Sequence, residues 1–352
     1  MAGKRARRVG AGVALGLAAV PAGAFGGYVW HTMTYAEREA RAVARAGYAE
    51  KRTTIDGRAV NYAEGPDNGP ALLLIHGQIT DWRGWSRVLP RLARHYHVFA
   101  VDCYGHGGSA HAPETYTANA LAAGMVAFLD RVVGRPATIA GHSSGGLIAA
   151  GVAAAAPHRV RGLVLEDPPL FATLLPRAKE TFNYVTLATL AHEFLADGAT
   201  DFTDYYLRNA VIWELFGGAA DAVKNTAQRY RRRHPGAPVK IFFMPPVLNE
   251  LFRALGSYDP RFGDAFYTGS FDAGFDHAET LSRITAPVAQ IHVKPRYDDA
   301  GILQAAMSEP EARRTRSLLH DVRLYRADTG HNFHFEKPDR FVDIVRELSA
   351  RT

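Results

Sequence analysis

Short apolar runs alternate with longer amphipathic stretches through most of the chain. The apolar runs are predicted to be strands and lie at 71–76, 97–105, 137–143, 160–169, 287–293 and 321–328. Stretches with helical spacing lie at 81–96, 116–134, 145–158, 301–320 and 339–350. A hairpin around Asp56-Gly57 precedes the first buried strand. Runs that are apolar on both faces and joined by helices indicate an α/β fold with a mostly parallel sheet flanked by helices.

The alternation stops after Pro169 and resumes near residue 284. The intervening residues are rich in aromatic side chains, lack parallel-strand runs and show helical spacing around 180–196, 202–233 and 246–256. We therefore predict a core built from 52–169 and 284–352, with a mainly helical cap inserted at 170–283. Most of the cap's aromatic residues are expected to form its own core, and the others to line an apolar pocket.

The N-terminal segment differs in composition from the rest of the chain. Four basic residues among the first eight precede an uncharged stretch at 9–30, and crossing a bilayer takes about 20 residues. Ala22-Gly23-Ala24 fits a signal-peptide cleavage site, so residues 1–30 are predicted to be an uncleaved anchor or a cleaved signal, with a cytoplasmic helix as the third alternative. Positive charge before the stretch places the body outside the cytoplasm in the first two cases.

Residues 31–51 mix Ala with charges of both signs and are predicted to form a solvated helical stalk. The formal net charge of the chain is +6, and residues 1–52, with nine basic and three acidic side chains, account for all of it. Because the rest of the chain is neutral, no nucleic-acid partner is expected. Cys103 is the single cysteine, which excludes an intrachain disulfide and a Cys-rich metal site. No metal or cofactor is expected.

The stretch Gly141-His142-Ser143-Ser144-Gly145 lies where a predicted strand turns directly into a predicted helix. It fits the pattern G-x-S-x-G, in which the middle residue is held in a strained conformation and its neighbours must be small. The Ser143 hydroxyl would then stand clear of the sheet at the positive end of a helix, where developing negative charge is stabilised. Ser143 is therefore the predicted nucleophile.

A serine hydroxyl is a poor nucleophile until a base takes its proton. His331 follows the last predicted strand and a glycine, which places it at the same edge of the sheet as Ser143. We predict that His331 is this base. His334, three residues later, is the competing candidate.

A carboxylate is needed to orient the imidazole and offset its charge. Asp298 is the first choice because it follows the predicted strand at 287–293, and its neighbour Asp299 is the second. Asp167, at the end of an earlier strand, is the third. Spacing alone does not separate Asp298 from Asp299, and one of the two is expected to cap the following helix.

Backbone N–H groups aimed at the reacting carbonyl are needed to stabilise an oxyanion. The N–H of Ser144 is one predicted donor. The second is the N–H of Gln78, in the loop that follows the first buried strand. His76 is expected to fix this loop by hydrogen bonding.

Four stretches together resemble the α/β-hydrolase superfamily, in particular its serine esterases and lipases: "HGQ" (76–78), "DCYGHGGS" (102–109), "GHSSGG" (141–146) and "GHNFH" (330–334). The resemblance runs from about residue 52 to the end, apart from the insertion, which matches the family's cap or lid. It implies the same site residues: Ser143 as nucleophile, His331 as base, Asp298 or Asp299 as acid, and Gln78 and Ser144 as oxyanion donors. The family's usual glycine soon after the strand at 287–293 is absent here.

The expected activity is cleavage of a carboxylic ester of a small, apolar substrate through an acyl-enzyme. Epoxide hydrolases and haloalkane dehalogenases of this fold use Asp as nucleophile, so a serine argues against them. Thioesterase, amidase, C–C hydrolase and perhydrolase chemistry on the same triad are alternatives. A ligand-binding protein with vestigial turnover is the alternative outside enzymes. The expected partners are a small acyl substrate and, if the N-terminal segment stays uncleaved, a membrane.

Overall fold

The computed structural model of the chain describes residues 22–352. Within them, eight strands form one sheet in the order β1-β2-β4-β3-β5-β6-β7-β8. The strands are β1 (Ala49–Ile55), β2 (Arg58–Glu64), β3 (Ala71–Ile75), β4 (His97–Val101), β5 (Ala137–His142), β6 (Val160–Glu166), β7 (Val288–Val293) and β8 (Val322–Ala327). β1 and β2 form the predicted antiparallel hairpin, and β2 is antiparallel to β4. All other neighbouring strands are parallel, which confirms the predicted fold class.

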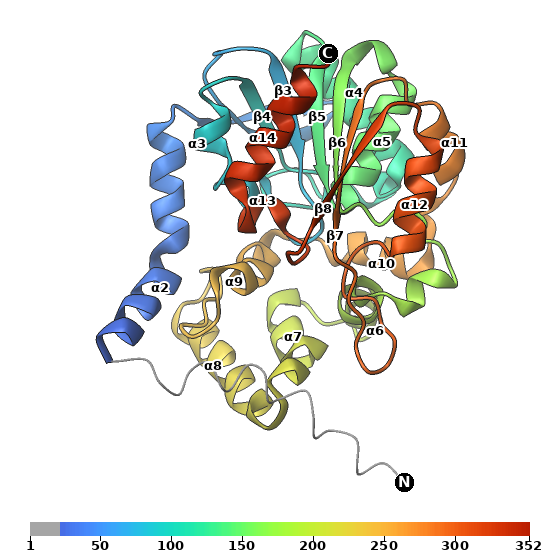
Figure 1. Cartoon of the computed structure of the whole chain (residues 1–352). Coiled ribbons are helices and arrows are strands. Elements are labelled where there is room, and N and C mark those ends of the chain that lie inside the picture. The colour runs from blue at the N-terminus through green and yellow to red at the C-terminus, as the bar shows by residue number, and fades with distance from the viewer. Residues whose placement is uncertain (1–21) are drawn as a thin grey trace.

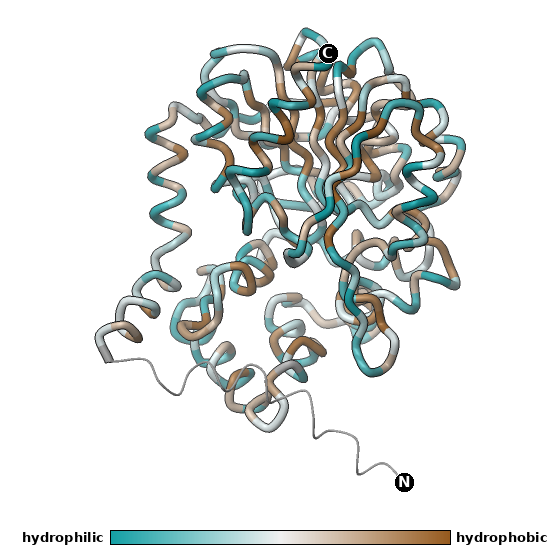
Figure 2. Tube along the Cα trace, viewed as in Figure 1, coloured by the Kyte–Doolittle hydropathy of each residue, from teal (hydrophilic) through white to brown (hydrophobic). Residues whose placement is uncertain are grey.

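Helices cover both faces of the sheet (Figure 1). One face carries α4 (Ala118–Phe128) and α5 (Ser144–Ala155), with α11 (His277–Ser282) and α12 (Glu309–Leu318) beside them. The other face carries the 3₁₀ turn η1 (Trp82–Trp85), α3 (Leu89–Leu92), α13 (Phe333–Glu336) and α14 (Pro338–Ser349). Because water reaches neither face, all residues of β3, β5 and β7 are buried, and the central strands are coloured as hydrophobic in Figure 2.

The segment between β6 and β7 folds into helices that, apart from α11, lie below the sheet in Figure 1, and we call residues 170–283 the cap segment. Its α-helices are α6 (Thr189–Ala196), α7 (Phe202–Asn209), α8 (Ala220–Arg233), α9 (Pro246–Arg253), α10 (Pro260–Thr268) and the short α11. The first four fall within the stretches with predicted helical spacing, and α10 and α11 lie beyond them. Twelve of the nineteen Phe, Tyr and Trp side chains in the cap segment are buried.

Two predicted core helices are shorter than their patterns indicate. The stretch 81–96 holds only η1 and α3. The stretch 301–320 forms a helix only from Glu309, because Ser308 and Glu311 make a reciprocal capping box there. The residues before Ser308 are left as a loop.

The predicted solvated stalk requires a correction. Helix α2 (Ala22–Arg45) covers most of that stretch, and β1 begins at Ala49, before the expected start of the core at residue 52. Tyr35 and Val43 of α2 are buried against the body, each with 3% of its surface exposed. The sequence did not reveal that one side of α2 is buried, because only a few residues on that side are apolar and the rest of the helix alternates Ala with charged residues.

The predicted membrane segment, 9–30, lies mostly outside the described residues, and 22–30 form the first turns of α2. Between residues 22 and 352, no helix combines the length and the apolar composition needed to cross a membrane.

Candidate active site

Ser143 lies at the turn between β5 and α5, as predicted. Its backbone φ of 54° and ψ of −127° place it in the left-handed half of conformational space, which is strained for a residue with a Cβ. The backbone N–H of Ser143 donates to Glu166 O, so the neighbouring strand β6 helps to hold this conformation. The turn lifts the side chain off the end of the sheet at the N-terminus of α5.

The glycines around Ser143 are required by close approach of the backbone. A Cβ on Gly145 would lie 2.3 Å from Ile75 O, and a Cβ on Gly141 would lie 2.3 Å from Gly145 O. Strand and helix can therefore meet at this sharp turn only when both positions lack a side chain.

His331 lies in the loop between β8 and α13, at the same end of the sheet as Ser143. Both side chains line one cavity. His331 Nδ1 is 2.7 Å from Asp167 Oδ2, so the ring is anchored on one side, which leaves Nε2 available to a substrate or nucleophile. Among the described residues, no hydrogen bond joins Ser143 Oγ to His331, and such contacts are often long without substrate.

The carboxylate beside His331 is therefore Asp167 and not Asp298 or Asp299, which corrects the sequence-based preference. Asp167 follows β6 directly, has a φ of 41° and is fully buried. Its Oδ2 also accepts the Ala306 N–H at 3.1 Å. The carboxylate is held in place because Asp167 directly follows the last residue of β6 and because Ala306 N–H and His331 Nδ1 both contact Oδ2.

Asp298 instead stabilises its own loop. It lies five residues beyond β7, where its Oδ1 accepts the N–H groups of Ala300 and Ile302 at 3.0 and 2.9 Å. The same loop pairs with the cap segment through Phe182 N–H and Leu303 O, at 2.9 Å. These contacts draw the loop away from His331 and leave Asp298 and Asp299 exposed.

His334, the competing base, is occupied elsewhere. It is buried, its Nδ1 lies 2.8 Å from Glu166 Oε1, and it does not line the cavity. His142, Glu166 and His334 have ligand atoms within 4.8 Å of one another, close enough to hold a metal ion. Hydrogen bonds already use these atoms, because Glu166 contacts His334 and His142 Nε2 contacts His331 O at 3.1 Å. We therefore assign no metal to this cluster.

Of the two predicted oxyanion donors, Gln78 lines the same cavity and Ser144 is the residue next to Ser143. Ser143 itself lines the cavity, and Ser144 begins α5. The backbone N–H groups of Gln78 and Ser144 donate to no other group in residues 22–352. His76 fixes the loop as expected: its Nε2 accepts the Cys103 N–H at 3.0 Å and its Nδ1 lies 2.7 Å from Gly77 O. Burial lowers the pKa of His76 to about 4, so the ring is neutral at pH 7.

The cavity has a volume of about 360 Å³ and lies between the end of the sheet and the cap segment. Phe182, Tyr184, Tyr206 and Phe266 are the aromatic residues of the cap segment among its lining. The lining within the described residues includes the carboxylates Glu250 and Glu336 but no Lys or Arg.

Comparison with known families identifies the family of the chain. The sequence profile described as the Alpha/beta hydrolase family matches residues 72–344, which is more than half of the chain. The chain belongs to this family. The match begins within β3 and ends within α14, so it includes every strand-end residue of the candidate site.

Individual relatives of this α/β hydrolase differ in chemistry. The chain is 37% identical over 120 residues to a dihydrolipoyllysine-residue acetyltransferase component of the acetoin cleaving system from Pseudomonas putida, covering 34% of this chain and 32% of that one. It is 40% identical over 105 residues to Lipase LipV of Mycobacterium tuberculosis, covering 30% and 39%. The match thus spans less than two fifths of the length of either relative.

A solved structure of a hydrolase from Pseudomonas aeruginosa has the same fold. It superimposes with a TM-score of 0.59 at 23% identity, covering 85% of this chain and 97% of that one. At this identity the likeness concerns the fold alone.

One residue of the α/β hydrolase site was missed by the sequence analysis. His292, in β7, is buried on the far side of the carboxylate, with its Nδ1 3.9 Å from Asp167 Oδ1. The other ring nitrogen, Nε2, lies 3.3 Å from Glu309 Oε2, and Asp167 Oδ1 has no hydrogen-bond partner among the described residues. Burial lowers the pKa of His292. No local pattern marks this position, because His292 occupies an ordinary buried place in a strand.

Proposed function

We propose that this protein is a serine hydrolase that cleaves a carboxylic ester through an acyl-enzyme. The observation that carries the proposal is the position of Ser143. It occupies a strained turn, at the N-terminus of a helix, on the same cavity as a histidine whose other nitrogen contacts a buried carboxylate. This arrangement suits activation of a hydroxyl group.

In the proposed reaction, Ser143 Oγ forms a bond with the ester carbonyl carbon while its proton passes to His331 Nε2. The negative charge on the carbonyl oxygen is stabilised by the N–H groups of Gln78 and Ser144. The C–O bond of the ester then breaks, and the alcohol leaves with the proton from His331. Water, deprotonated by His331, attacks the acyl-enzyme, and the carboxylic acid and free Ser143 result. Asp167 orients the imidazole and offsets its positive charge.

The cavity supports a neutral and largely apolar substrate. Leu187, Leu248 and Phe266 offer apolar surface on the cap side. Glu336 at the lining, without a Lys or Arg among the described lining residues, disfavours a negatively charged substrate, whereas the charge of Glu250 is offset by Arg253. The charge distribution of the N-terminal segment supports a location outside the cytoplasm, either anchored or secreted.

The test compares the full chain with a Ser143→Ala variant and with a Ser317→Ala variant, which changes an exposed serine far from the cavity. A fluorophosphonate probe is expected to label the wild type and Ser317→Ala but not Ser143→Ala. Hydrolysis of short p-nitrophenyl esters is expected to fall by about 10⁴–10⁶-fold in kcat for Ser143→Ala. Unchanged turnover by this variant would rule out the proposed chemistry.

A panel of matched substrates separates esterase activity from the chemistry of related enzymes. Oxygen esters, thioesters and anilides with the same acyl group are compared by kcat/KM. The proposal expects the oxygen ester to be the preferred substrate. Preference for a thioester or an anilide would keep the serine mechanism but replace the proposed bond type.

A further inference from the structure

The loop that carries the oxyanion donor Gln78, residues 77–81, contains a residue with a strained backbone conformation. Ile79 has a φ of 51°, in the left-handed region that a β-branched residue rarely adopts. A conformation of this kind is unfavourable and persists only where the surroundings hold it. The contacts at the two ends of the loop therefore decide where the Gln78 N–H points.

The first end of the loop is held by the core and by the loop itself. His76 Nδ1 lies 2.7 Å from Gly77 O, and Thr80 Oγ1 donates to the same oxygen at 3.3 Å. A Cβ on Gly77 would lie 2.9 Å from the Ser143 Cβ, so the backbone passes directly against the proposed nucleophile.

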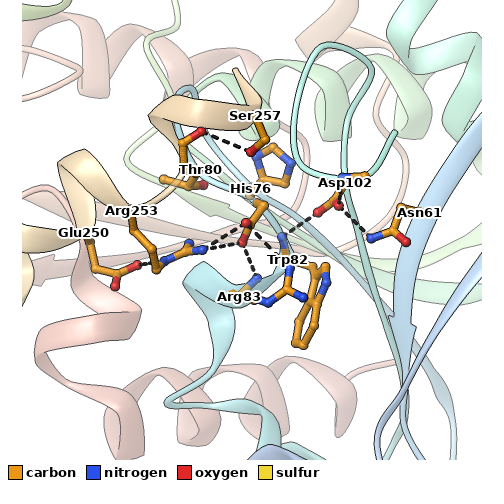
Figure 3. A network of polar contacts seen from close by, with 12 residues as sticks. Asn61, His76, Thr80, Trp82, Arg83, Asp102, Glu250, Arg253 and Ser257 are labelled. Carbon is orange, nitrogen blue, oxygen red and sulfur yellow. Dashed lines mark hydrogen bonds and ion pairs between the residues drawn. The ribbon is translucent and has the colours of Figure 1, made fainter. Parts of the chain in front are cut away.

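The second end of the loop is held by the cap segment. Asp81 is buried, and its two carboxylate oxygens lie 2.8 and 2.9 Å from Arg253 Nη1, on α9. In Figure 3, the Arg253 side chain extends from the cap segment toward the chain that carries Thr80, Trp82 and Arg83. Burial alone would raise the pKa of Asp81, but Arg253 and Arg83 outweigh burial and lower it, so the pair is charged at neutral pH.

Arg253 is itself held by Glu250 of the same helix, and Glu250 is held by helix α2. Arg253 Nε donates to Glu250 Oε2 at 2.6 Å, and the Tyr35 hydroxyl of α2 donates to Glu250 Oε1 at 2.6 Å. Tyr35, Glu250, Arg253 and Asp81 thus form one buried series of charge-assisted hydrogen bonds, which are stronger than neutral ones. The series begins on the N-terminal helix and ends beside the loop 77–81.

We propose that Arg253 is a positioning residue for the oxyanion donor, and that Tyr35 and Glu250 hold Arg253 in the geometry this requires. The inference rests on the proposed function. An independent contact supports it, because the Tyr258 hydroxyl, also from the cap segment, donates to Gln78 Oε1 at 3.2 Å. The cap segment therefore shapes the chemical step, in addition to covering the substrate.

The expected signature is a loss in kcat with little change in KM. An oxyanion donor binds the negatively charged oxygen of the transition state more tightly than the ester carbonyl of the substrate, so its displacement slows the reaction without weakening substrate binding. A residue that only kept the cap segment folded would instead change protein stability or KM.

The experiment measures kcat and KM for a short p-nitrophenyl ester with the full chain and single variants. Arg253→Met is expected to lower kcat by about 10²-fold, at the lower end of the loss when an oxyanion donor is removed, with KM within about twofold. Arg253→Lys is expected to recover part of that loss because it keeps a positive charge beside Asp81. Tyr35→Phe, which removes one hydroxyl group from the series, is expected to lower kcat by about threefold.

Tyr28→Phe is the matched control. Tyr28 also lies on α2, and its hydroxyl group donates to the cap segment, to Phe243 O at 3.0 Å, outside the series. It is expected to leave kcat unchanged. Equal losses in Tyr28→Phe and Tyr35→Phe would overturn the proposal, because loosening of α2 would then explain both.

Thermal unfolding of each variant reports whether it folds. If Arg253→Met does not fold, Arg253→Lys and Tyr35→Phe decide the question by the same split between kcat and KM. Unchanged kcat in the folded Arg253 variants overturns the inference while leaving the proposed function intact. A wild type that hydrolyses no ester in a Ser143-dependent way overturns the proposed function itself.

Discussion

The two sides of the cavity are built in different ways. On the core side, Ser143, Asp167 and His331 each lie at or just beyond the end of a strand, and Ser143 and Asp167 both have a positive φ. On the cap side, the lining comes mainly from helices and their connections, with residues such as Leu248 and Phe266. The core side is rich in hydrogen bonds, whereas the cap side offers mostly apolar surface.

This difference suits the core side to the chemical step and the cap side to substrate selection. Proton transfer and attack need atoms held to a fraction of an ångström, and a parallel sheet buried on both faces provides that rigidity. An apolar wall needs only the right shape, so helices of an inserted segment are sufficient. Arg253 is the exception, since it lies on the cap side and contacts the core side through Asp81.

The largest expected effect tests which carboxylate acts together with His331 on the core side. Asp167→Asn is expected to lower kcat by about 10⁴-fold, because an amide cannot offset the charge on His331 and favours the wrong tautomer. Steady-state kinetics on a p-nitrophenyl ester measure this loss.

Asp298→Asn is the matched control for that experiment, because it makes the same change in the loop after the neighbouring strand. Its kcat is expected to stay within about twofold of wild type, since Asp298 contacts only its own loop. The reverse ranking of the two variants would show that the loop after β7 moves its carboxylate to His331 during catalysis.

A second prediction concerns the pH dependence of stability. Burial lowers the pKa of His76 to about 4 and also lowers the pKa of His106 and His142. The unfolded chain therefore binds more protons than the folded one below pH 6.5, and the free energy of unfolding is expected to fall as the pH drops from 6.5 toward 4. The shift of His76 alone corresponds to about 3 kcal/mol over this range.

Asp102 acts in the opposite direction. Burial, followed by the nearby charge of Asp81, raises its pKa to about 6, so protonation of Asp102 favours the folded state between pH 6 and 3.8. The lowered pKa values of the buried histidines, including His292, outweigh this effect. Urea denaturation at a series of pH values measures how the free energy of unfolding changes with pH. His106→Asn is expected to make this pH dependence weaker. A free energy of unfolding that rises on acidification in this range contradicts the prediction.

The smallest expected effect lies on the cap side. Leu248→Ala removes apolar surface from the lining and enlarges the cavity. The loss of apolar contacts with the acyl chain changes discrimination between acyl chains by about tenfold. The ratio of kcat/KM for octanoate over butyrate esters is expected to rise by about that factor. The equivalent change at Leu195, an exposed cap residue outside the cavity lining, is the control and is expected to leave the ratio unchanged.

The sequence alone was sufficient for the features that depend on neighbouring residues. The positions of the strands along the chain, the turn at Ser143 with its glycines, and the placement of His331 after the last strand all follow from local patterns. Each reflects a requirement that a few consecutive residues satisfy by themselves, such as burial of an apolar run or the absence of a side chain at a close approach.

Only the tertiary structure decided which carboxylate meets His331, how α2 packs, and which cap residue holds the loop 77–81. Asp167 and His331 are 164 residues apart, and Asp81 and Arg253 are 172 apart. Several carboxylates follow strands in this chain, and the path of the loop after β7, drawn to the cap segment by its own hydrogen bonds, removed Asp298 from His331. Such contacts depend on the packing of the whole chain, because no short segment contains both partners or the surface that buries them.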